Sequence, residues 1–557
     1  MRIKIKLDNT KNAAYQELEV KGIETLEELA EEFRDEIKYR PMMAKVNGVD
    51  VALTETVKDG ELVEFIDATC QAGNLVYQRT LSMVFLKAAD KVVGDGTVRI
   101  LNPLNKGLFI KFDIEPSITE EQLNAISQLM DEYVANDEII AEKYLGRDEA
   151  IETLRGLGYE DKALLIEQAE EVKQVCFHTI GDYSNFFYGI VAPSTGYVDR
   201  FQLMAYGNGA ILRFPYTDNP KVLPEYRDDV KLYQAFADVE DWDRLLDINY
   251  VADLNKVIDY GNVRDMVLLS EALHEKRIAE IADMITKNHK RIVLIAGPSS
   301  SGKTSFARRL CVQLRVNGFM PLYMGTDDYF VEREDSPVDE NGEKDYENLN
   351  AMDLELFNNN MNDLLDGKTV DMPVFNFITG HKEFGKRFTT LSANGVLVVE
   401  GIHALNEAMS SQIDAEDKFK VYISPLTQLN VDRHNRISTT DARMLRRIVR
   451  DHNFRGHSAE NTINDWPKVR AGEDKNIFPY NGEADVLFNS VTVYELALLK
   501  KHAQPLLEQV AKDSPCYSEA RRLVDFLQYF KALEDEHYIP NNSIMREFIG
   551  GSVLIEE

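Results

Sequence analysis

A short glycine-rich stretch in the second half of the chain restricts its fold more than any other feature. Gly297 to Thr304 reads G-x-x-x-x-G-K-T, the phosphate-binding loop pattern. The apolar run Ile292 to Ala296 precedes it, and Ser305 to Arg315 follows with apolar residues at helical spacing. The loop therefore lies between a buried strand and a helix N-terminus, where backbone N–H groups and the helix dipole attract phosphate.

Individual residues of this loop have predictable roles. The Lys303 ammonium can reach the terminal phosphates of a nucleotide, and the Thr304 hydroxyl can ligate Mg²⁺. The alternative, an ordinary turn before a helix, is disfavoured by the strand on one side and the helix on the other. The residues expected to bind the phosphates are Gly297, Ser299, Ser300, Ser301, Gly302, Lys303, Thr304 and Ser305.

Composition excludes several classes of protein. The chain has 557 residues and a formal net charge of −31, which argues against strong nucleic-acid binding. Its four cysteines show no paired spacing, which fits a reducing cytosol. No apolar run approaches membrane-spanning length, and Met1 to Lys6 alternates instead of forming a signal segment. We therefore expect a cytoplasmic protein with no membrane contact.

Acidic residues follow two further strands of the predicted sheet. From Arg291 onward, short apolar runs alternate with helical patterns, which is typical of a doubly wound α/β fold. The run Pro321 to Thr326 ends at Asp327, and Gly395 to Val399 ends at Glu400. Because ligands bind beyond the carboxyl ends of such strands, both carboxylates are expected beside the loop, as a base for a hydroxyl or as Mg²⁺ ligands. A turn or a helix cap is the alternative for each.

One cluster of arginines stands out in this acidic chain. Arg443, Arg447 and Arg450 have the spacing of one helix face, and guanidinium groups suit phosphate oxygens. One alternative is a solvated helix face on which the arginines pair with aspartates. Another is an RNA-binding patch, which is less favoured because no aromatic residues lie between the arginines. The cluster comprises Arg433, Arg436, Arg443, Arg446, Arg447, Arg450 and Arg455.

With these motifs, the segment from Arg291 to about Val491 resembles the uridine kinase/phosphoribulokinase family of P-loop kinases. The matching stretches are Asp327 to Phe330, Tyr346 to Asp353, Pro373 to Phe377, Glu400-Gly401, Arg446 to Asp451 and Arg455-Gly456. The resemblance implies a P-loop NTPase-type parallel sheet that transfers the γ-phosphate of ATP, with Mg²⁺, to a nucleoside 5′-hydroxyl, of uridine or cytidine.

The resemblance also assigns roles. It makes Asp327 the catalytic base, Glu347 the ligand of the ribose hydroxyls, and Phe375 and His381 part of the nucleoside pocket. It implies Mg²⁺ ligands Thr304, Glu400 and Asp327. The lid arginines would be Arg447, Arg450 and Arg455, with Arg447 also near the acceptor and Arg455 near ATP.

Departures from the family pattern fall at the positions that read the base and in the lid. Phe375 replaces a tyrosine, Asn376 replaces an aspartate, His381 is shifted by one place, and His457 replaces a lid arginine. Phosphoryl transfer is therefore better supported than uridine specificity. Two alternatives remain: a kinase for another small hydroxyl compound, such as a sugar phosphate or small acid, and a nucleotide- or tRNA-binding regulator.

The N-terminal part resembles a different family. Residues 1–68 show strands, a capped helix at Thr25 and an Asn47-Gly48 turn, and resemble the β-grasp TGS domain of threonyl-tRNA synthetases. A small protein-binding module is the alternative.

Residues 69–215 resemble the second additional domain of those synthetases, an α+β editing domain. Its four metal-ligand positions correspond here to Arg79, Met83, Phe187 and Val191, none of which binds metal, and Cys176 and His178 are out of register. We predict that this domain lacks the hydrolytic site.

The remaining boundaries are less marked. We expect a helical connector over residues 216–288, the kinase-like domain over 289–500 and a helical tail over 501–557. The expected partners are ATP and a small nucleoside, and a homo-oligomer is left open.

Overall fold

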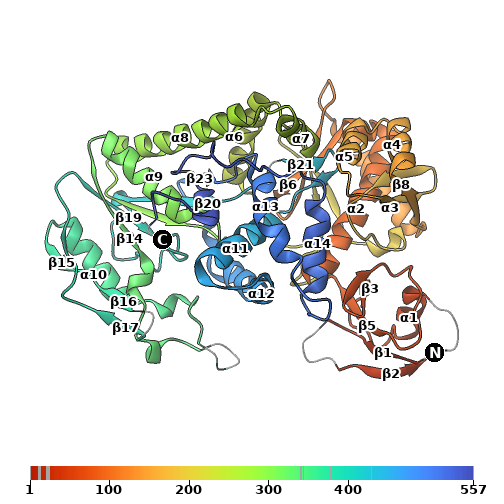
Figure 1. Cartoon of the computed structure of the whole chain (residues 1–557), viewed down its shortest axis with the longest axis horizontal. Helices are drawn as coiled ribbons and strands as arrows, with labels where there is room; N and C mark the ends of the chain where they lie inside the picture. Colours follow the sequence, from red (N-terminus) through yellow and green to blue (C-terminus); the bar gives the residue numbers. More distant parts are fainter. Residues whose placement is uncertain are drawn as a thin grey trace.

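The computed structural model describes residues 2–9, 14–20, 25–338, 342, 344–376, 379–427 and 429–555, with only the backbone of 237–244 (Figure 1). A parallel sheet and its helices occupy the left of Figure 1, and the synthetase-like domain occupies the right with the β-grasp domain below it. None of the helices in the described ranges combines the length and the apolar character needed to cross a membrane.

The N-terminal domain is a β-grasp unit, as its sequence pattern predicts. Its sheet has the order β2-β1-β5-β3-β4. The predicted capping box is confirmed, because Glu28 N–H donates to Thr25 Oγ1 and Thr25 N–H donates to the Glu28 carboxylate. Its elements are β1 (Arg2–Lys6), β2 (Gln16–Glu19), α1 (Leu26–Glu32), β3 (Pro41–Val46), β4 (Val49–Val51) and β5 (Leu62–Asp67).

The synthetase-like domain has two antiparallel sheets: the four-stranded sheet packs against a long helix, α2 (Gln71–Val92), and the three-stranded sheet packs against two shorter helices, α4 (Arg147–Gly156) and α5 (Glu160–Gln168). The sheets have the orders β11-β12-β7-β6 and β10-β9-β8. Its strands are β6 (Val98–Leu104), β7 (Gly107–Phe112), β8 (Ala141–Gly146), β9 (Gln174–Ile180), β10 (Tyr183–Phe186), β11 (Gln202–Tyr206) and β12 (Gly209–Arg213). A further helix is α3 (Glu120–Ala135).

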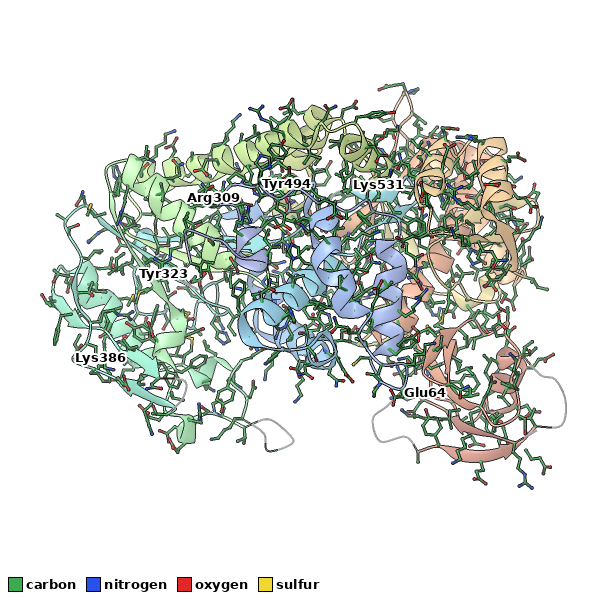
Figure 2. The ribbon with its side chains drawn as sticks, in the orientation of Figure 1. Glu64, Arg309, Tyr323, Lys386, Tyr494 and Lys531 are labelled. Atoms are coloured by element: carbon green, nitrogen blue, oxygen red, sulfur yellow. The ribbon has the colours of Figure 1, made fainter. Side chains whose placement is uncertain are left out.

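Three helices connect this domain to the parallel sheet: α6 (Val230–Leu246), α7 (Val251–Asp259) and α8 (Val263–Lys287). Helix α8 packs against α9 (Lys303–Val316), and Figure 2 labels Arg309 of α9. This arginine forms ion pairs with Glu271 and Glu275 of α8. The Arg309 side chain is nearly fully buried, so this contact fixes the helix that begins at the phosphate loop.

The parallel sheet has the strand order β14-β19-β13-β20-β23. Alternate residues of the central strand enter different cores, since Val293 packs in one cluster and Ile292 and Leu294 in another. A strand buried on both faces reads as a continuous apolar run, which is why the sequence predicts it. The strands are β13 (Ile292–Ala296), β14 (Met320–Gly325), β19 (Gly395–Glu400), β20 (Lys418–Ser424) and β23 (Val486–Asn489).

Helices cover both faces of this sheet. One core includes residues of α8, α9, α11 and α13, and the other includes residues of α10. The helices are α10 (Leu354–Leu365), α11 (Thr439–Arg455), α12 (Ala459–Asn476), α13 (Glu495–Leu507), α14 (Tyr517–Leu527) and α15 (Arg546–Ile549). Short strands complete the domain: β15 (Thr369–Asp371), β16 (Val374–Asn376), β17 (His381–Glu383), β18 (Phe388–Thr390), β21 (Asn430–Asp432) and β22 (Asn435–Arg436).

The C-terminal segment folds back onto the phosphate loop. Ile544, Met545 and Phe548 are fully buried in the core that also contains Phe306 and Ile448. A Cβ at Gly302 would stand 2.6 Å from Ile544 Cγ2, and the φ of Gly302 is +82°, so both space and backbone conformation require glycine there.

Candidate active site

The phosphate loop connects β13 to the N-terminus of α9, as predicted. Ser300 and Gly302 both have positive φ, the conformation that turns successive N–H groups into one concave surface. The Lys303 Nζ donates to the carbonyls of Gly297 at 2.9 Å and Pro298 at 3.1 Å. Burial lowers the pKa of Lys303, and the nearby Glu400 carboxylate opposes that shift.

A carboxylate at the end of β19 faces the loop. Glu400 Oε1 accepts hydrogen bonds from the Thr304 hydroxyl at 2.9 Å and from the Tyr323 hydroxyl at 2.9 Å. Its other oxygen, Oε2, is buried and has no hydrogen-bond partner among the described residues. Burial raises the pKa of Glu400, and Lys303 opposes the rise. Hydroxyl and carboxylate oxygens are the donors that Mg²⁺ prefers, so Thr304 and Glu400 fit this ion.

Two neighbouring carboxylates at the end of β14 have different surroundings. Asp328 accepts from the Phe375 N–H at 3.2 Å and forms an ion pair with Arg387 at 2.9 Å. The Asp327 side chain is exposed and lies near the loop. Partial loss of hydration raises the pKa of Asp327, and the charge of Lys303 opposes that rise. Asp328 is therefore held by Phe375 and Arg387, whereas the Asp327 side chain has no hydrogen bond or ion pair within the described residues.

Helix α11 brings arginines onto the loop in two ways. Arg443 and Arg446 are almost fully buried and donate to the carbonyls of Ser299 at 3.1 Å and Ser300 at 3.3 Å. Arg447 donates to the Ser299 hydroxyl at 2.7 Å. The buried pair, Arg443 and Arg446, binds the backbone of the loop, whereas Arg447 binds a loop side chain.

The two remaining lid candidates lie further along α11, Arg450 about one turn beyond Arg447 and Arg455 at the end of the helix. Arg450 and Arg455 both form ion pairs with Asp451, at 3.0 Å and 3.3 Å. Arg455 is about half exposed and lies close enough to Asp327 for each to shift the other's pKa. One buried aspartate therefore holds three members of the predicted cluster, since Arg447 also pairs with Asp451. The structure does not bring Arg433 and Arg436 to the loop: Arg433 pairs with Asp161, and Arg436 lines a separate cavity.

Two carboxylates bind loop groups that a nucleotide phosphate would use. Glu473 of α12 accepts from the Ser299 N–H at 2.9 Å and also pairs with Arg443. Glu547 of α15 accepts from the Ser305 N–H at 3.1 Å and from its hydroxyl at 2.7 Å. Both come from segments far along the chain and carry no motif, so no local sequence signal could have found them.

The expected acceptor-binding residues lie on separate elements. Glu347 packs against Gly472 of α12, and burial, together with the nearby Glu473, raises its pKa to about 7. Phe375 of β16 makes an edge-to-face contact with Phe330 at 5.7 Å between ring centroids. His381 of β17 forms an ion pair with Glu332 at 2.6 Å. The structure thus places Glu347 near Arg447 and the loop. His381, which lies on the hairpin β16-β17, is held by Glu332.

The synthetase-like domain does not assemble a metal site at the family positions. Met83, Phe187 and Val191 are buried among apolar residues. Arg79 donates to the Ile190 carbonyl at 3.3 Å.

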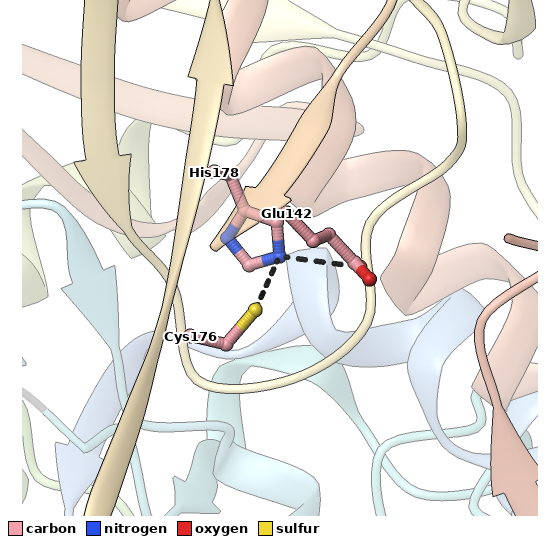
Figure 3. A group of neighbouring side chains, drawn as sticks. All are labelled: Glu142, Cys176 and His178. Carbon is pink, nitrogen blue, oxygen red and sulfur yellow. Dashed lines mark hydrogen bonds and ion pairs between the residues drawn. The ribbon is translucent and has the colours of Figure 1, made fainter. Parts of the chain in front are cut away.

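A separate group of possible metal ligands lies on the neighbouring sheet (Figure 3). His178 Nε2 stands 3.9 Å from Cys176 Sγ and 3.7 Å from Glu142 Oε1. Burial raises the pKa of Cys176 to about 11, so metal binding would have to displace its proton. His178 Nδ1 has no acceptor among the described residues, whereas metal-bound histidines usually have one. The absence of a hydrolytic zinc site therefore stays a prediction.

Fold and site together define a P-loop α/β protein with a kinase-like active site. Residues 292–497 match the Phosphoribulokinase / Uridine kinase family. A uridine kinase from Macrococcus caseolyticus is 31% identical over 209 residues, which are 36% of this chain and 91% of that protein. The chain therefore belongs to the Phosphoribulokinase / Uridine kinase family through its C-terminal half.

The N-terminal half is similar to threonine–tRNA ligases, which confirms the predicted fusion. The ligase from Caldanaerobacter subterraneus subsp. tengcongensis is 28% identical over 186 residues, 33% of this chain and 29% of the ligase. This chain thus spans less than a third of that enzyme. Among solved structures, a "Possible Uridine Kinase" from Bacillus stearothermophilus covers 38% of this chain and 98% of its own, at 19% identity and a TM-score of 0.27.

Proposed function

We propose that this protein is an ATP- and Mg²⁺-dependent kinase that phosphorylates the 5′-hydroxyl of a nucleoside, uridine or cytidine. One observation carries the proposal. Three groups follow three adjacent strands, β13, β14 and β19: the loop with Lys303 and Thr304, the exposed carboxylate of Asp327, and Glu400, which has one carboxylate oxygen without a hydrogen bond among the described residues. The carboxyl edge of a parallel sheet is where such folds bind their ligands.

The proposed reaction uses these residues in distinct roles. The acceptor hydroxyl oxygen attacks the γ-phosphorus, its proton passes to Asp327, and the bond to the bridging oxygen breaks to release ADP. Lys303 and Arg447 stabilise negative charge on the transferring group. When bound by Thr304 and Glu400, Mg²⁺ supplies further neutralisation of the phosphate oxygens.

Support for a nucleoside acceptor comes from Glu347 and the aromatic pair. A carboxylate can accept hydrogen bonds from two ribose hydroxyls, and Phe330 and Phe375 offer an apolar contact for a base. The pKa of Glu347, raised to about 7, leaves the carboxyl partly protonated at neutral pH. That weakens the ribose assignment and keeps a sugar phosphate or small acid as the second candidate acceptor.

A panel assay tests the acceptor. Purified full-length protein is incubated with ATP and Mg²⁺ and, separately, uridine, cytidine, adenosine, several sugar phosphates and several hydroxy acids, and product is identified by mass spectrometry. We expect uridine or cytidine monophosphate. Phosphorylation of only a sugar phosphate or acid would refute the nucleoside assignment and keep the kinase. ATP binding with no acceptor phosphorylated would favour a regulator.

A further inference from the structure

A cavity of about 850 Å³ lies where the two halves of the chain meet. Its wall combines α2, the turn at Gly189 and Ile190, residues 431–444 of the kinase-like domain and helices α12 and α14. The volume falls within the range of small-molecule binding sites, roughly 300–1,000 Å³. Aromatic side chains contribute much of the apolar wall, among them Phe187, Tyr188, Trp466 and Tyr529.

Two guanidinium groups on this wall have no carboxylate partner among the described residues. Arg79 donates only to the carbonyl of Ile190, and the Arg436 side chain has no hydrogen bond or ion pair within the described ranges. The other arginines of the wall are neutralised. Arg522 pairs with Asp441 and Glu519, each at 2.7 Å, and Arg521 pairs with Asp525 at 2.8 Å.

Both guanidinium groups are half-buried, so each has lost part of its hydration without gaining a carboxylate partner among the described residues. Burial lowers the pKa of Arg79 to about 10 and also lowers the pKa of Arg436. A buried charge is normally paired, because the loss of hydration is otherwise uncompensated. The nearest carboxylates do not supply a partner: Asp441 is bound by Arg522, and burial raises the pKa of Asp50.

The position of Arg79 gives its charge a defined place in the cavity. The guanidinium lies over Gly189, where a Cβ would stand 2.9 Å from it. Arg79 also occupies the first of the four positions at which the synthetase resemblance implies metal ligands. A fixed guanidinium thus presents positive charge where that resemblance places a cation, and its planar donors suit phosphate or carboxylate oxygens.

We propose that this cavity binds a small anionic ligand, a phosphate ester or a carboxylate on an apolar or aromatic body, through Arg79 and Arg436. The anion neutralises the two guanidinium groups, and the aromatic wall covers the remainder of the ligand. This binding does not depend on the kinase activity proposed above.

The cavity shares two helices with the phosphate loop. Helix α11 lines the cavity with Met444 and reaches the loop through Arg447, and α12 lines it with Trp466 and reaches the loop through Glu473. A ligand that shifts either helix also shifts a group bound to Ser299. We therefore expect occupancy of the cavity to change ATP turnover as well, a consequence that rests on the proposed function.

Tryptophan fluorescence tests the binding directly. The chain has two tryptophans, so Trp242→Phe leaves Trp466 of the cavity wall as the only reporter. The full-length variant is titrated with inorganic pyrophosphate, uridine monophosphate and benzoate, and with neutral uridine for comparison. Each titration is repeated with Arg79→Gln or Arg436→Gln added, with Lys303→Ala added to weaken the phosphate loop, and with the exposed Arg34→Gln as a matched control.

We expect a saturable response to at least one anion that weakens by about tenfold or more in both cavity variants, equivalent to about 1.4 kcal/mol. The response should persist in Arg34→Gln and Lys303→Ala. A response to pyrophosphate and uridine monophosphate assigns phosphate, and a response to benzoate assigns carboxylate. A response lost only in Lys303→Ala would place the anion at the phosphate loop and overturn the proposal. If the cavity variants fail to fold, absence of any saturable response in the parent Trp242→Phe chain overturns it equally.

Discussion

Lys303 is the cation that belongs to the phosphate loop itself, and its present contacts are with loop carbonyls. A phosphate chain can replace those carbonyls because the ammonium is already at the concave side of the loop. The proposed chemistry rests on four functional groups: the ammonium and hydroxyl at the start of α9, and two carboxylates at the ends of β14 and β19.

Removing the ammonium tests the loop. Lys303→Ala should fold normally and lose nearly all turnover, because its charge acts on the transferring phosphate. Steady-state kinetics and circular dichroism together make the measurement. Turnover within about threefold of the parent would exclude the loop from the mechanism.

Glu347 has a pKa of about 7 in the folded chain, above its ordinary value of 4.5. The folded state therefore holds this proton to higher pH than the unfolded chain does. Its favourable contribution to stability is complete below pH 4.5 and is lost as pH rises to 7. Glu347→Gln should remove this loss, so the midpoint of thermal unfolding of the variant should rise relative to the parent between these pH values. An equal shift in the exposed control Glu36→Gln, or none at all, would contradict the assignment.

At the scale of elements, the prediction from sequence succeeded where partners are close along the chain. The strand, loop and helix around Lys303 follow from local pattern, and Asp327 and Glu400 follow from the rule that strand ends share an edge. The contacts of Glu473 and Glu547 could not be predicted, because they depend on how α12 and α15 pack. Spacing alone also placed Arg443 with Arg447, whereas the structure buries Arg443 against Ser299 and Glu473.

Helix α11 carries two kinds of arginine: Arg443 and Arg446 bind the loop backbone, and Arg447 is the one proposed to act on the transferring phosphate. Arg447→Ala should lower kcat more than it weakens ATP binding, because a lid arginine acts mainly on charge that develops during transfer. Steady-state kinetics measure the change in kcat, and equilibrium binding of ATP measures the change in affinity. Normal turnover with normal binding would make Arg447 a solvated residue with no part in the reaction.

The segment around α15 places a carboxylate on the phosphate loop. Glu547→Gln removes a negative charge beside Ser305, where phosphate would otherwise meet repulsion, so the KM for ATP should fall by about threefold or more. The exposed Glu534→Gln is the matched control and should leave the KM unchanged. A higher KM in Glu547→Gln would mean that the carboxylate supports the loop.

At the scale of the whole molecule, the two halves are joined by a buried polar contact. Lys162 of α5 and Asp432 of β21 are both fully buried and lie 3.7 Å apart, and Arg433 pairs with Asp161 at 3.1 Å. The Ile100 N–H donates to the Arg433 carbonyl at 2.9 Å, so the backbone of the two halves is also connected. Breaking a buried ion pair leaves an uncompensated charge, which favours a fixed arrangement of the halves. The resemblance to two separate families predicted both parts but gave no information about this joint.

The direct test of the central claim, phosphoryl transfer from the edge of the parallel sheet, compares Asp327→Asn with Asp328→Asn in the full-length chain. With ATP and the preferred acceptor saturating, we predict that Asp327→Asn lowers kcat by about 10²–10⁴ with little change in ATP affinity, because the substituted side chain keeps its shape and loses its basicity. Asp328→Asn should change kcat only a few-fold, since that carboxylate is held by Arg387 and the Phe375 N–H. The account would be contradicted if only Asp328→Asn lost activity, or if both variants kept the activity of the parent.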